Sequence, residues 1–306
     1  MIEAAIIVIR LAQYAAAAML FGSASFHLYA PIADLSPDLA YRARALLVWA
    51  AALLAVASLA AIAAQAIFFA GSIEGGLTRE SLSAVAFQMD LGKAALVRSA
   101  AAVAALTALA ALAPGRRAWA FAVAFGAVAT VSLAWMGHAG AGEGDGGRIL
   151  LASDVLHMLA AAGWLGALAA FVQVLLLKPA TVDMARALHG ALHRFATVGS
   201  ILVATLVVTG TVNTLSILGL EGIATIWTST YGRLLLLKLA MFAAMLGLAA
   251  VNRLRLTPAL AGELRDAQSV QGALGGLRRS VVLETLAGAA VLALVAWLGT
   301  LSPTTP

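Results

Sequence analysis

In this chain of 306 residues, 63% of the residues are hydrophobic and only 11% are charged, whereas soluble domains are about half apolar. The mean hydropathy of +0.99 excludes an ordinary soluble protein and predicts a polytopic membrane protein. The chain has no cysteine, which excludes disulfides, thiolate metal sites and thioether-linked haem. The net charge of +5 does not indicate a nucleic-acid-binding protein, because the basic residues are scattered over short connecting stretches.

Eight segments reach the length of about 20 mainly apolar residues that a transmembrane helix needs. The first is not a cleavable signal peptide, because Glu3 precedes any positive charge and the apolar run continues to about Ala30. Proline and glycine separate the segments. The sequence predicts an all-α protein, a single domain of residues 1–306 that forms a bundle of eight transmembrane helices. The expected spans are roughly 4–30, 43–70, 82–113, 117–138, 148–177, 192–218, 231–252 and 280–300.

Lysine and arginine are distributed unequally between the two sides of this predicted bundle. Twelve lie in the connections on one side, and only four, Arg10, Arg79, Arg148 and Arg233, lie on the side that holds both termini. The positive-inside rule then predicts periplasmic termini in a bacterial inner membrane. On the inner side, residues 259–279 space their apolar residues at helical intervals and predict an interfacial helix, with a solvated loop as the alternative because three glycines interrupt it.

The fifth span carries polar residues that a lipid bilayer does not solvate. In SDVLHMLAAAGWLGALAAF, from Ser153 to Phe171, the residues Asp154, His157 and Met158 follow at i, i+3 and i+4 and are expected on one helix face. Ionisable residues at such depth usually face a cavity, a metal or a partner. The preceding span ends in WMGHAG, so Met136 and His138 are expected at the outer mouth, close to this face.

This set of side chains is suited to a copper ion that descends from the outer mouth. Thioether and imidazole suit Cu(I), and imidazole with oxygen suits Cu(II); zinc would accept the same nitrogens. The candidate metal ligands are His138, His157, Asp154, Met136 and Met158. The structural alternative is that His138 is an interfacial residue and that His157 only forms a hydrogen bond to a neighbouring helix.

Further charged and polar residues are expected in the outer halves of three other spans. Because unpaired charges there cost at least about 2.5 kcal/mol each, they are predicted to face one another or an aqueous vestibule. An internal salt-bridge network that only fastens the helices is the alternative, and it concerns above all Asp90, Lys93 and Arg98. Thr209 is a further candidate for this lining. The proposed vestibule lining is Asp90, Lys93, Asn213, Tyr231 and Lys238.

On the inner side, His27 near the end of the first span and Glu284 near the start of the eighth are candidates for a second tier of ligands. Glu284 is followed by several turns of apolar residues, so it is either an exit ligand or a counter-charge to nearby arginines. No G-x-S-x-G, H-E-x-x-H or phosphate-binding loop is present, and the sequence predicts no enzyme.

Four blocks of the chain resemble the copper resistance protein D (CopD) family. They are WMGHAG, the segment from Ser153 to Phe171, YGRLLLLKLAMFAAMLGLAAVNRLRLTPAL from Tyr231, and LRRSVVLETLAGAAVLALVAWLGTLSP from Leu277. The resemblance is strongest over residues 130–304. The family's outer histidine block would correspond to His138, and its D-x-x-H block would correspond to Asp154 and His157.

The resemblance implies an eight-helix inner-membrane protein of copper homeostasis that moves copper from periplasm to cytoplasm. It also implies a separate periplasmic copper-binding partner similar to the C protein of copper resistance. Two alternatives stay open. One is a membrane protein that binds haem b, with His27 and His157 as axial ligands, and the other is a membrane partner of a copper chaperone that transports nothing. The sequence does not fix the copper oxidation state or the oligomeric state.

Overall fold

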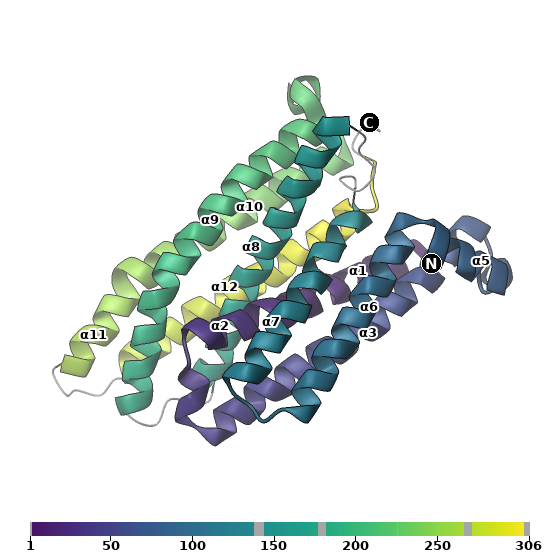
Figure 1. Ribbon diagram of the computed structural model, residues 1–306. Coiled ribbons are helices and arrows are strands. Elements are labelled where there is room, and N and C mark those ends of the chain that lie inside the picture. Colours follow the sequence, from purple (N-terminus) through teal and green to yellow (C-terminus); the bar gives the residue numbers. More distant parts are fainter. Residues whose placement is uncertain (1, 138–143, 177–181, 225, 266–270, 303–306) are drawn as a thin grey trace.

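The computed structural model describes residues 2–137, 144–176, 182–224, 226–265 and 271–302. Within these ranges the chain forms helices and no strand. Eight helical stretches are long and apolar enough to cross a membrane, which confirms the predicted all-α bundle (Figure 1). Because an even number of spans returns the chain to its starting side, the first and last helices begin and end at the same end of the bundle (Figure 1). Which side of the membrane this end faces stays a prediction.

The N-terminal half contains the first four spans. The first span consists of α1 (Ile2–Ala17), the π-helical turn η1 (Ala18–Ser23) and α2 (Ala24–Tyr29), and the 3-10 turn η2 (Ile32–Leu35) leads to the second span, α3 (Pro37–Ala70). Three short elements follow: α4 (Ile73–Gly76), α5 (Arg79–Ser83) and η3 (Ala84–Gln88). The third span is α6 (Asp90–Ala111), and the fourth is α7 (Arg116–Val131) with η4 (Ser132–Met136).

The C-terminal half contains the other four spans, and its helices are longer. Helix α9 includes a break at Gly219, whose φ of 66° is in the left-handed region. The elements are α8 (Gly144–Leu176), α9 (Val182–Ala224), α10 (Thr230–Val251), the π-helical turn η6 (Asn252–Leu256), α11 (Thr257–Arg265) and α12 (Gln271–Leu298).

Several boundaries differ from the sequence expectation: α3 begins at Pro37 and not at about 43, and α9 begins at Val182 and not at about 192. Two further differences concern residues of the predicted site. The third span was expected from about residue 82, but Met89 has an extended backbone and α6 begins at Asp90, where an acidic residue suits the helix N-terminus. The eighth span was expected from about residue 280, but α12 already begins at Gln271 because Leu274 and Leu277 are buried and continue the helix. Glu284 therefore lies in the fourth turn of α12 and not in its first.

The stretch 259–279 is not a separate interfacial helix within the described residues. Instead, α11 continues α10 through η6, so that Thr230–Arg265 forms one apolar helical stretch. The remainder belongs to the start of α12 or lies outside the described residues.

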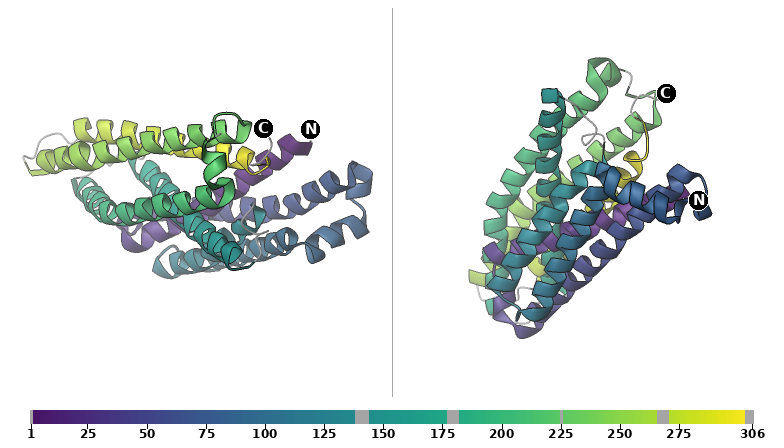
Figure 2. Two further views of the ribbon diagram at one scale, coloured as in Figure 1. Left: turned by 90° about the horizontal axis from the view of Figure 1, so that it is seen from above. Right: turned by 45° about the vertical axis from the view of Figure 1, so that its right-hand side comes forward.

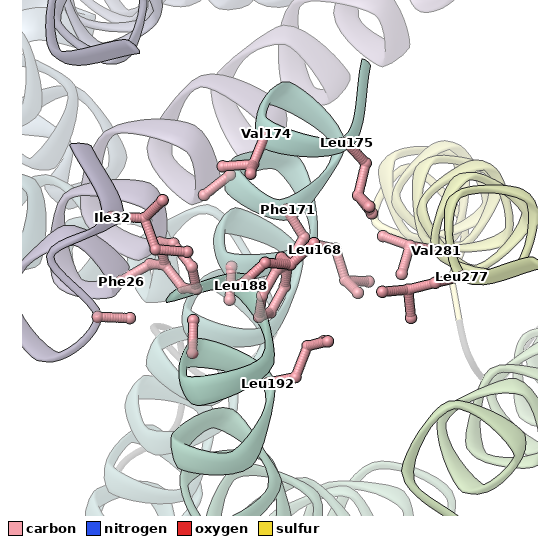
Figure 3. Close-up of a cluster of buried hydrophobic side chains, with 14 of the residues drawn as sticks. Phe26, Ile32, Leu168, Phe171, Val174, Leu175, Leu188, Leu192, Leu277 and Val281 are labelled. Atoms are coloured by element: carbon pink, nitrogen blue, oxygen red, sulfur yellow. The ribbon is translucent and has the colours of Figure 1, made fainter. Parts of the chain in front are cut away.

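Helix α8 lies between the two halves. One buried cluster joins α8 to α2, η2, α9 and α12, and Figure 3 shows Phe171 and Leu168 of α8 pointing toward Phe26, Leu188 and Leu277. A second cluster joins the helices of the N-terminal half and includes Met158 of α8 at its edge. In Figure 2 (left) the green and yellow helices α9, α10 and α12 lie on one side and the blue helices on the other.

The joint between η1 and α8 is a glycine crossing. A side chain on Gly166 would collide with the backbone of Ala18 and Gly22, and a side chain on Gly22 would collide with the carbonyl oxygen of Ala162. The wide turn η1 lies at this crossing, and the Ser23 hydroxyl donates a hydrogen bond of 2.8 Å to the carbonyl oxygen of Gly166. The absence of side chains on both glycines is what allows the two backbones to touch.

Candidate functional site

The polar residues of α8 are held by a matching row on α9. The Nδ1 atom of His157 lies 2.9 Å from Oγ1 of Thr209, and Oδ1 of Asp154 accepts a hydrogen bond of 3.2 Å from the amide of Asn213. The Ser153 hydroxyl donates to the carbonyl oxygen of Thr209 at 3.2 Å. Because residues four apart share a helix face, Thr209 and Asn213 contact residues on one face of α8.

The hydrogen bonds of Thr209 determine which nitrogen of His157 carries the proton. The Thr209 hydroxyl donates its single proton to the carbonyl oxygen of Thr205 at 2.6 Å, so toward His157 it acts as an acceptor. Nδ1 of His157 is then the donor, and the neutral ring has its lone pair on Nε2. A ring that donates through one nitrogen and presents the other is the usual form of a metal-binding histidine.

His157 lines a cavity of about 370 Å³ between α8, α9, α10 and α12, which we call the histidine cavity. Its walls are mostly apolar. Lys238 of α10 is the charged residue among the lining residues and interacts electrostatically with Asp154. Deeper along α8, Trp164 lines the same cavity seven residues after His157, which is about 10 Å along a helix axis.

Trp164 connects this cavity to a buried carboxylate. Its indole nitrogen donates to Oε1 of Glu284 at 3.0 Å, and the amide of Asn252 donates to Oε2 at 2.9 Å. Glu284 is 1% exposed, and no ion pair within the described residues involves it. Asp154 and Glu284 thus share one arrangement, in which each carboxylate accepts a hydrogen bond from an asparagine amide.

The carbonyl oxygens of these two asparagines are also alike. Oδ1 of Asn213 and Oδ1 of Asn252 are buried and have no hydrogen-bond partner among the residues that the structure describes. Each therefore offers a metal ion an oxygen ligand beside a carboxylate. Within the described residues, however, no three His, Asp or Glu side chains gather into a ready metal centre.

The methionines predicted as ligands lie elsewhere. Met158 packs at the edge of the N-terminal cluster with Tyr14 and does not line the histidine cavity. The sulfur of Met136 accepts a hydrogen bond from Nη1 of Arg98, and its carbonyl oxygen accepts one of 3.1 Å from Arg10. His138 lies outside the described residues. The structure therefore does not bring these two methionines together with His157.

The predicted vestibule residues divide into two groups. Asn213 and Lys238 belong to the surroundings of Asp154, and Tyr231, in the first turn of α10, interacts electrostatically with it. Asp90 and Lys93 form a 2.9 Å ion pair on α6, with side chains 69% and 53% exposed. They lie in the N-terminal half, where Asp90 lines a different cavity.

His27 is far from His157. Its ring is buried against Trp119 and Phe26, with centroid distances of 5.4 and 5.5 Å, and neither of its nitrogens has a hydrogen-bond partner among the described residues. Phe26 contacts Phe171 at 4.7 Å. Phe171 follows His157 by fourteen residues, or about 21 Å along α8. This separation does not fit one iron held by both histidines.

Sequence reasoning missed three residues that the structure makes prominent. Trp164 was read as one apolar residue among many, although a buried indole usually needs an acceptor. Arg10 was counted as a residue of the outer surface, but it is 9% exposed and donates to the carbonyl oxygens of Met136 and Gly299. Gln13 is fully buried and joins Arg98 to the backbone of α3. An arginine and a glutamine inside an apolar span were the available signal.

Comparisons with known proteins cover most of the chain. The copper resistance protein D-like N-terminal domain matches residues 1–149, and copper resistance protein D matches residues 189–298. Residues 150–188, which include Asp154 and His157, lie between the two matches. No solved structure matches the chain.

A relative from Pseudomonas syringae pv. tomato, copper resistance protein D, is 36% identical over 302 residues, which are 97% of this chain and 96% of that protein. The similarity therefore extends beyond residues 130–304 into the first spans. This chain is a multi-pass membrane protein that belongs to the copper resistance protein D family.

Proposed function

We propose that this protein moves copper ions through the bacterial inner membrane, from periplasm to cytoplasm, along a path lined by α8. The ion is received at Asp154 and His157, passes the histidine cavity and reaches Glu284 beside Asn252. The name of the relative from Pseudomonas syringae supports copper as the cargo. The observation that carries the proposal is the hydrogen bond between His157 and Thr209. A Thr209 hydroxyl that donates to Thr205 accepts from Nδ1 of His157, which leaves the Nε2 lone pair for a metal.

The two carboxylate–asparagine pairs support a path with two stations. Asp154 with Asn213 and Glu284 with Asn252 each combine a carboxylate with an asparagine carbonyl oxygen that lacks a partner among the described residues. Imidazole and oxygen donors suit Cu(II), and imidazole also binds Cu(I). Transport requires binding that is weak enough to release the ion, and two incomplete ligand sets meet this condition better than one complete site.

Trp164 is the proposed barrier between the stations. Its buried indole lies at the deep end of the histidine cavity and is bonded to Glu284. An ion that leaves His157 must pass this ring before it reaches the carboxylate. Met136 and His138 are the proposed capture ligands at the outer mouth, with copper competing against Arg98 for the sulfur of Met136. We propose that the vestibule residues determine the electrostatic potential at the copper entrance; they are Asp90, Lys93, Tyr231 and Lys238.

The test is copper uptake into liposomes that contain only this protein. We expect His157→Ala to reduce the initial rate at least tenfold while the purified variant keeps the melting temperature of the wild type. His193→Ala is the matched control, because His193 is an exposed histidine on α9. Uptake by His157→Ala at the wild-type rate would remove His157 from the path. No uptake by the wild-type protein would favour the non-transporting partner of a copper chaperone, and a separate periplasmic copper-binding protein would then be added.

The haem b alternative rests on His27, a buried imidazole whose two nitrogens have no partner among the described residues. The visible spectrum of the purified protein tests it directly. A stoichiometric Soret band that is lost in His27→Ala would establish haem binding. Protein without such a band that still transports copper would leave His27 as a packing residue against Trp119.

A further inference from the structure

The N-terminal half contains a second cavity, of about 410 Å³, whose charged lining differs from that of the histidine cavity. It lies between α1, α3, α6 and η4, and we call it the arginine cavity. Arg10 and Arg98 line it together with Gln65, and Ile6, Ile62 and Leu91 supply apolar wall. Its volume is in the range of small-molecule sites.

Arg98 is completely buried in this wall, yet its partners are neutral. Its guanidinium donates to Oε1 of Gln13 at 3.0 Å, to the Ser132 hydroxyl at 3.3 Å and to the sulfur of Met136. The remaining nitrogen, Nη2, is buried and has no hydrogen-bond partner among the described residues. A buried charge normally needs an opposite charge as well as hydrogen bonds. Arg98 bonds only to neutral groups in the described part of the chain, and these bonds leave one of its nitrogens without a partner.

Arg10 adds a second positive charge to the same cavity. It is 9% exposed and donates to two backbone carbonyl oxygens, those of Gly299 and Met136. Among the residues that line the cavity, all of which the structure describes, Asp90 is the carboxylate. It already pairs with Lys93, and its side chain is 69% exposed. The two arginines therefore share a cavity in which no lining carboxylate is committed to them.

We propose that the arginine cavity binds an anionic amphiphile, with a phosphate or carboxylate group against Arg10 and Arg98 and an apolar chain against Ile6, Ile62 and Leu91. Planar guanidinium groups offer the directed hydrogen bonds that such oxyanions accept. Because Nη2 of Arg98 is fully buried, a small turn of this side chain must bring the nitrogen to the bound group. The polar group would supply the missing counter-charge, and the mostly apolar wall would exclude a fully hydrated anion. A phospholipid headgroup and a free fatty acid share this chemistry.

The experiment compares ligands on the purified full chain in a neutral detergent. Dioleoyl phosphatidylglycerol, dioleoyl phosphatidylcholine and sodium laurate are titrated separately, and the melting temperature and the native mass spectrum are recorded. We expect a saturable rise in melting temperature and a retained one-to-one adduct with phosphatidylglycerol or with laurate, but not with phosphatidylcholine. A response to phosphatidylglycerol identifies a lipid site, and a response to laurate alone identifies a site for free acids.

Variants show whether the effect arises in this cavity. We expect Arg10→Gln and Arg98→Gln each to weaken the response at least tenfold in ligand concentration. Ala61→Leu fills part of the cavity and keeps both arginines, so it tests the site even where an arginine variant does not fold. Arg148→Gln is the matched control, because Arg148 is 85% exposed and pairs only with Asp145 in the described part of the chain.

Three results would overturn the proposal. The first is equal stabilisation by the anionic and the zwitterionic lipid, without a response to laurate. The second is a response that Ala61→Leu and Arg10→Gln leave at the wild-type concentration. The third is a response that falls equally in Arg148→Gln, which would indicate diffuse attraction to a basic surface. None of these outcomes depends on copper transport, so the proposal stands or falls separately from the copper path.

Discussion

The arginine cavity and the histidine cavity have similar volumes, about 410 and 370 Å³, but their polar surroundings differ. The first presents two arginines that are bonded to neutral groups. The second presents His157 and Lys238, with Asp154 and Glu284 bonded at its borders. Because the bilayer solvates neither sign, each half must satisfy its charges internally. The comparison shows how differently two halves of one bundle do so.

The difference lies in which donor and acceptor atoms are left over. Among the described residues that line the arginine cavity, the buried side-chain atom without a partner is a donor, Nη2 of Arg98, which suits an anion. Beside the histidine cavity the atoms without partners are acceptors, the carbonyl oxygens of Asn213 and Asn252, which suit a cation. These leftover atoms indicate the charge of each ligand more directly than the formal charges do, because an atom already bonded within the protein is not available to a ligand.

The largest expected effect comes from separating the halves. Gly166→Val places a side chain against the backbone of Ala18 and Gly22, and we expect a loss of more than about 3 kcal/mol in stability because neither backbone can move aside. Thermal unfolding and size-exclusion chromatography measure it. Gly247→Ala is the control, since nothing lies within 4 Å of its added carbon and alanine favours the helix. Unchanged stability of Gly166→Val would mean that η1 and α8 do not touch.

A smaller effect is expected at the inner carboxylate. Glu284→Ala leaves the indole of Trp164 and the amide of Asn252 without their acceptor, and each buried donor without a partner costs about 1–3 kcal/mol. Glu284→Gln keeps one acceptor oxygen for Trp164, and its amide nitrogen donates to the otherwise unpartnered Oδ1 of Asn252 once the Asn252 amide turns over. We therefore expect a stability within about 1 kcal/mol of wild type but copper uptake reduced at least tenfold. Thermal unfolding and liposome uptake separate the two roles. Wild-type uptake by Glu284→Gln would show that the negative charge is not used.

The smallest expected effect concerns Lys238, the positive charge of the histidine cavity. Lys238→Met removes a cation that interacts with Asp154, so we expect copper to bind about tenfold more tightly, a change of about 1.4 kcal/mol, and to leave more slowly. Equilibrium copper titration and the efflux rate from loaded liposomes measure both. Arg186→Met is the control, because its side chain is 66% exposed on α9, pairs with Asp183 and has no proposed role in the copper path. Weaker copper binding by Lys238→Met would contradict the proposal that the histidine cavity binds a cation.

The helices of the fold were predictable because the bilayer imposes one rule on every span. Length and apolarity predicted all eight spans, but proline and glycine do not end a helix everywhere: Pro258 lies inside α11, and Gly144–Gly147 form the first turn of α8. The early start of α12 was missed because an arginine pair, Arg278 and Arg279, was taken as a boundary, whereas the apolar residues before it continue the helix. The break at Met89 had no strong sequence signal, since neither proline nor glycine occupies that position.

Neighbouring side chains of the site were predictable where both lie on one helix, but not where a contact joins two helices. Spacing correctly placed Asp154 and His157 near one another, and the predicted polar residues Thr209 and Asn213 contact them. Spacing alone did not show that Met158, one residue after His157, packs into the other half. The bond between Trp164 and Glu284 joins residues 120 positions apart, and no periodicity carries information over that distance.

The glycine crossing also sets the rules for exchanging parts between relatives. The two family matches end at residue 149 and resume at residue 189, which invites a recombination point somewhere between them. A chimera joined before Ala162 would combine η1 of one parent with the crossing part of α8 from the other, whereas a junction after Leu176 keeps both in one parent. Backbones that meet without any side chain between them tolerate no mismatch. Functional hybrids are therefore expected only when η1 and the crossing part of α8 come from the same parent. The choice of junction depends on this contact and not on the gap between the two family matches.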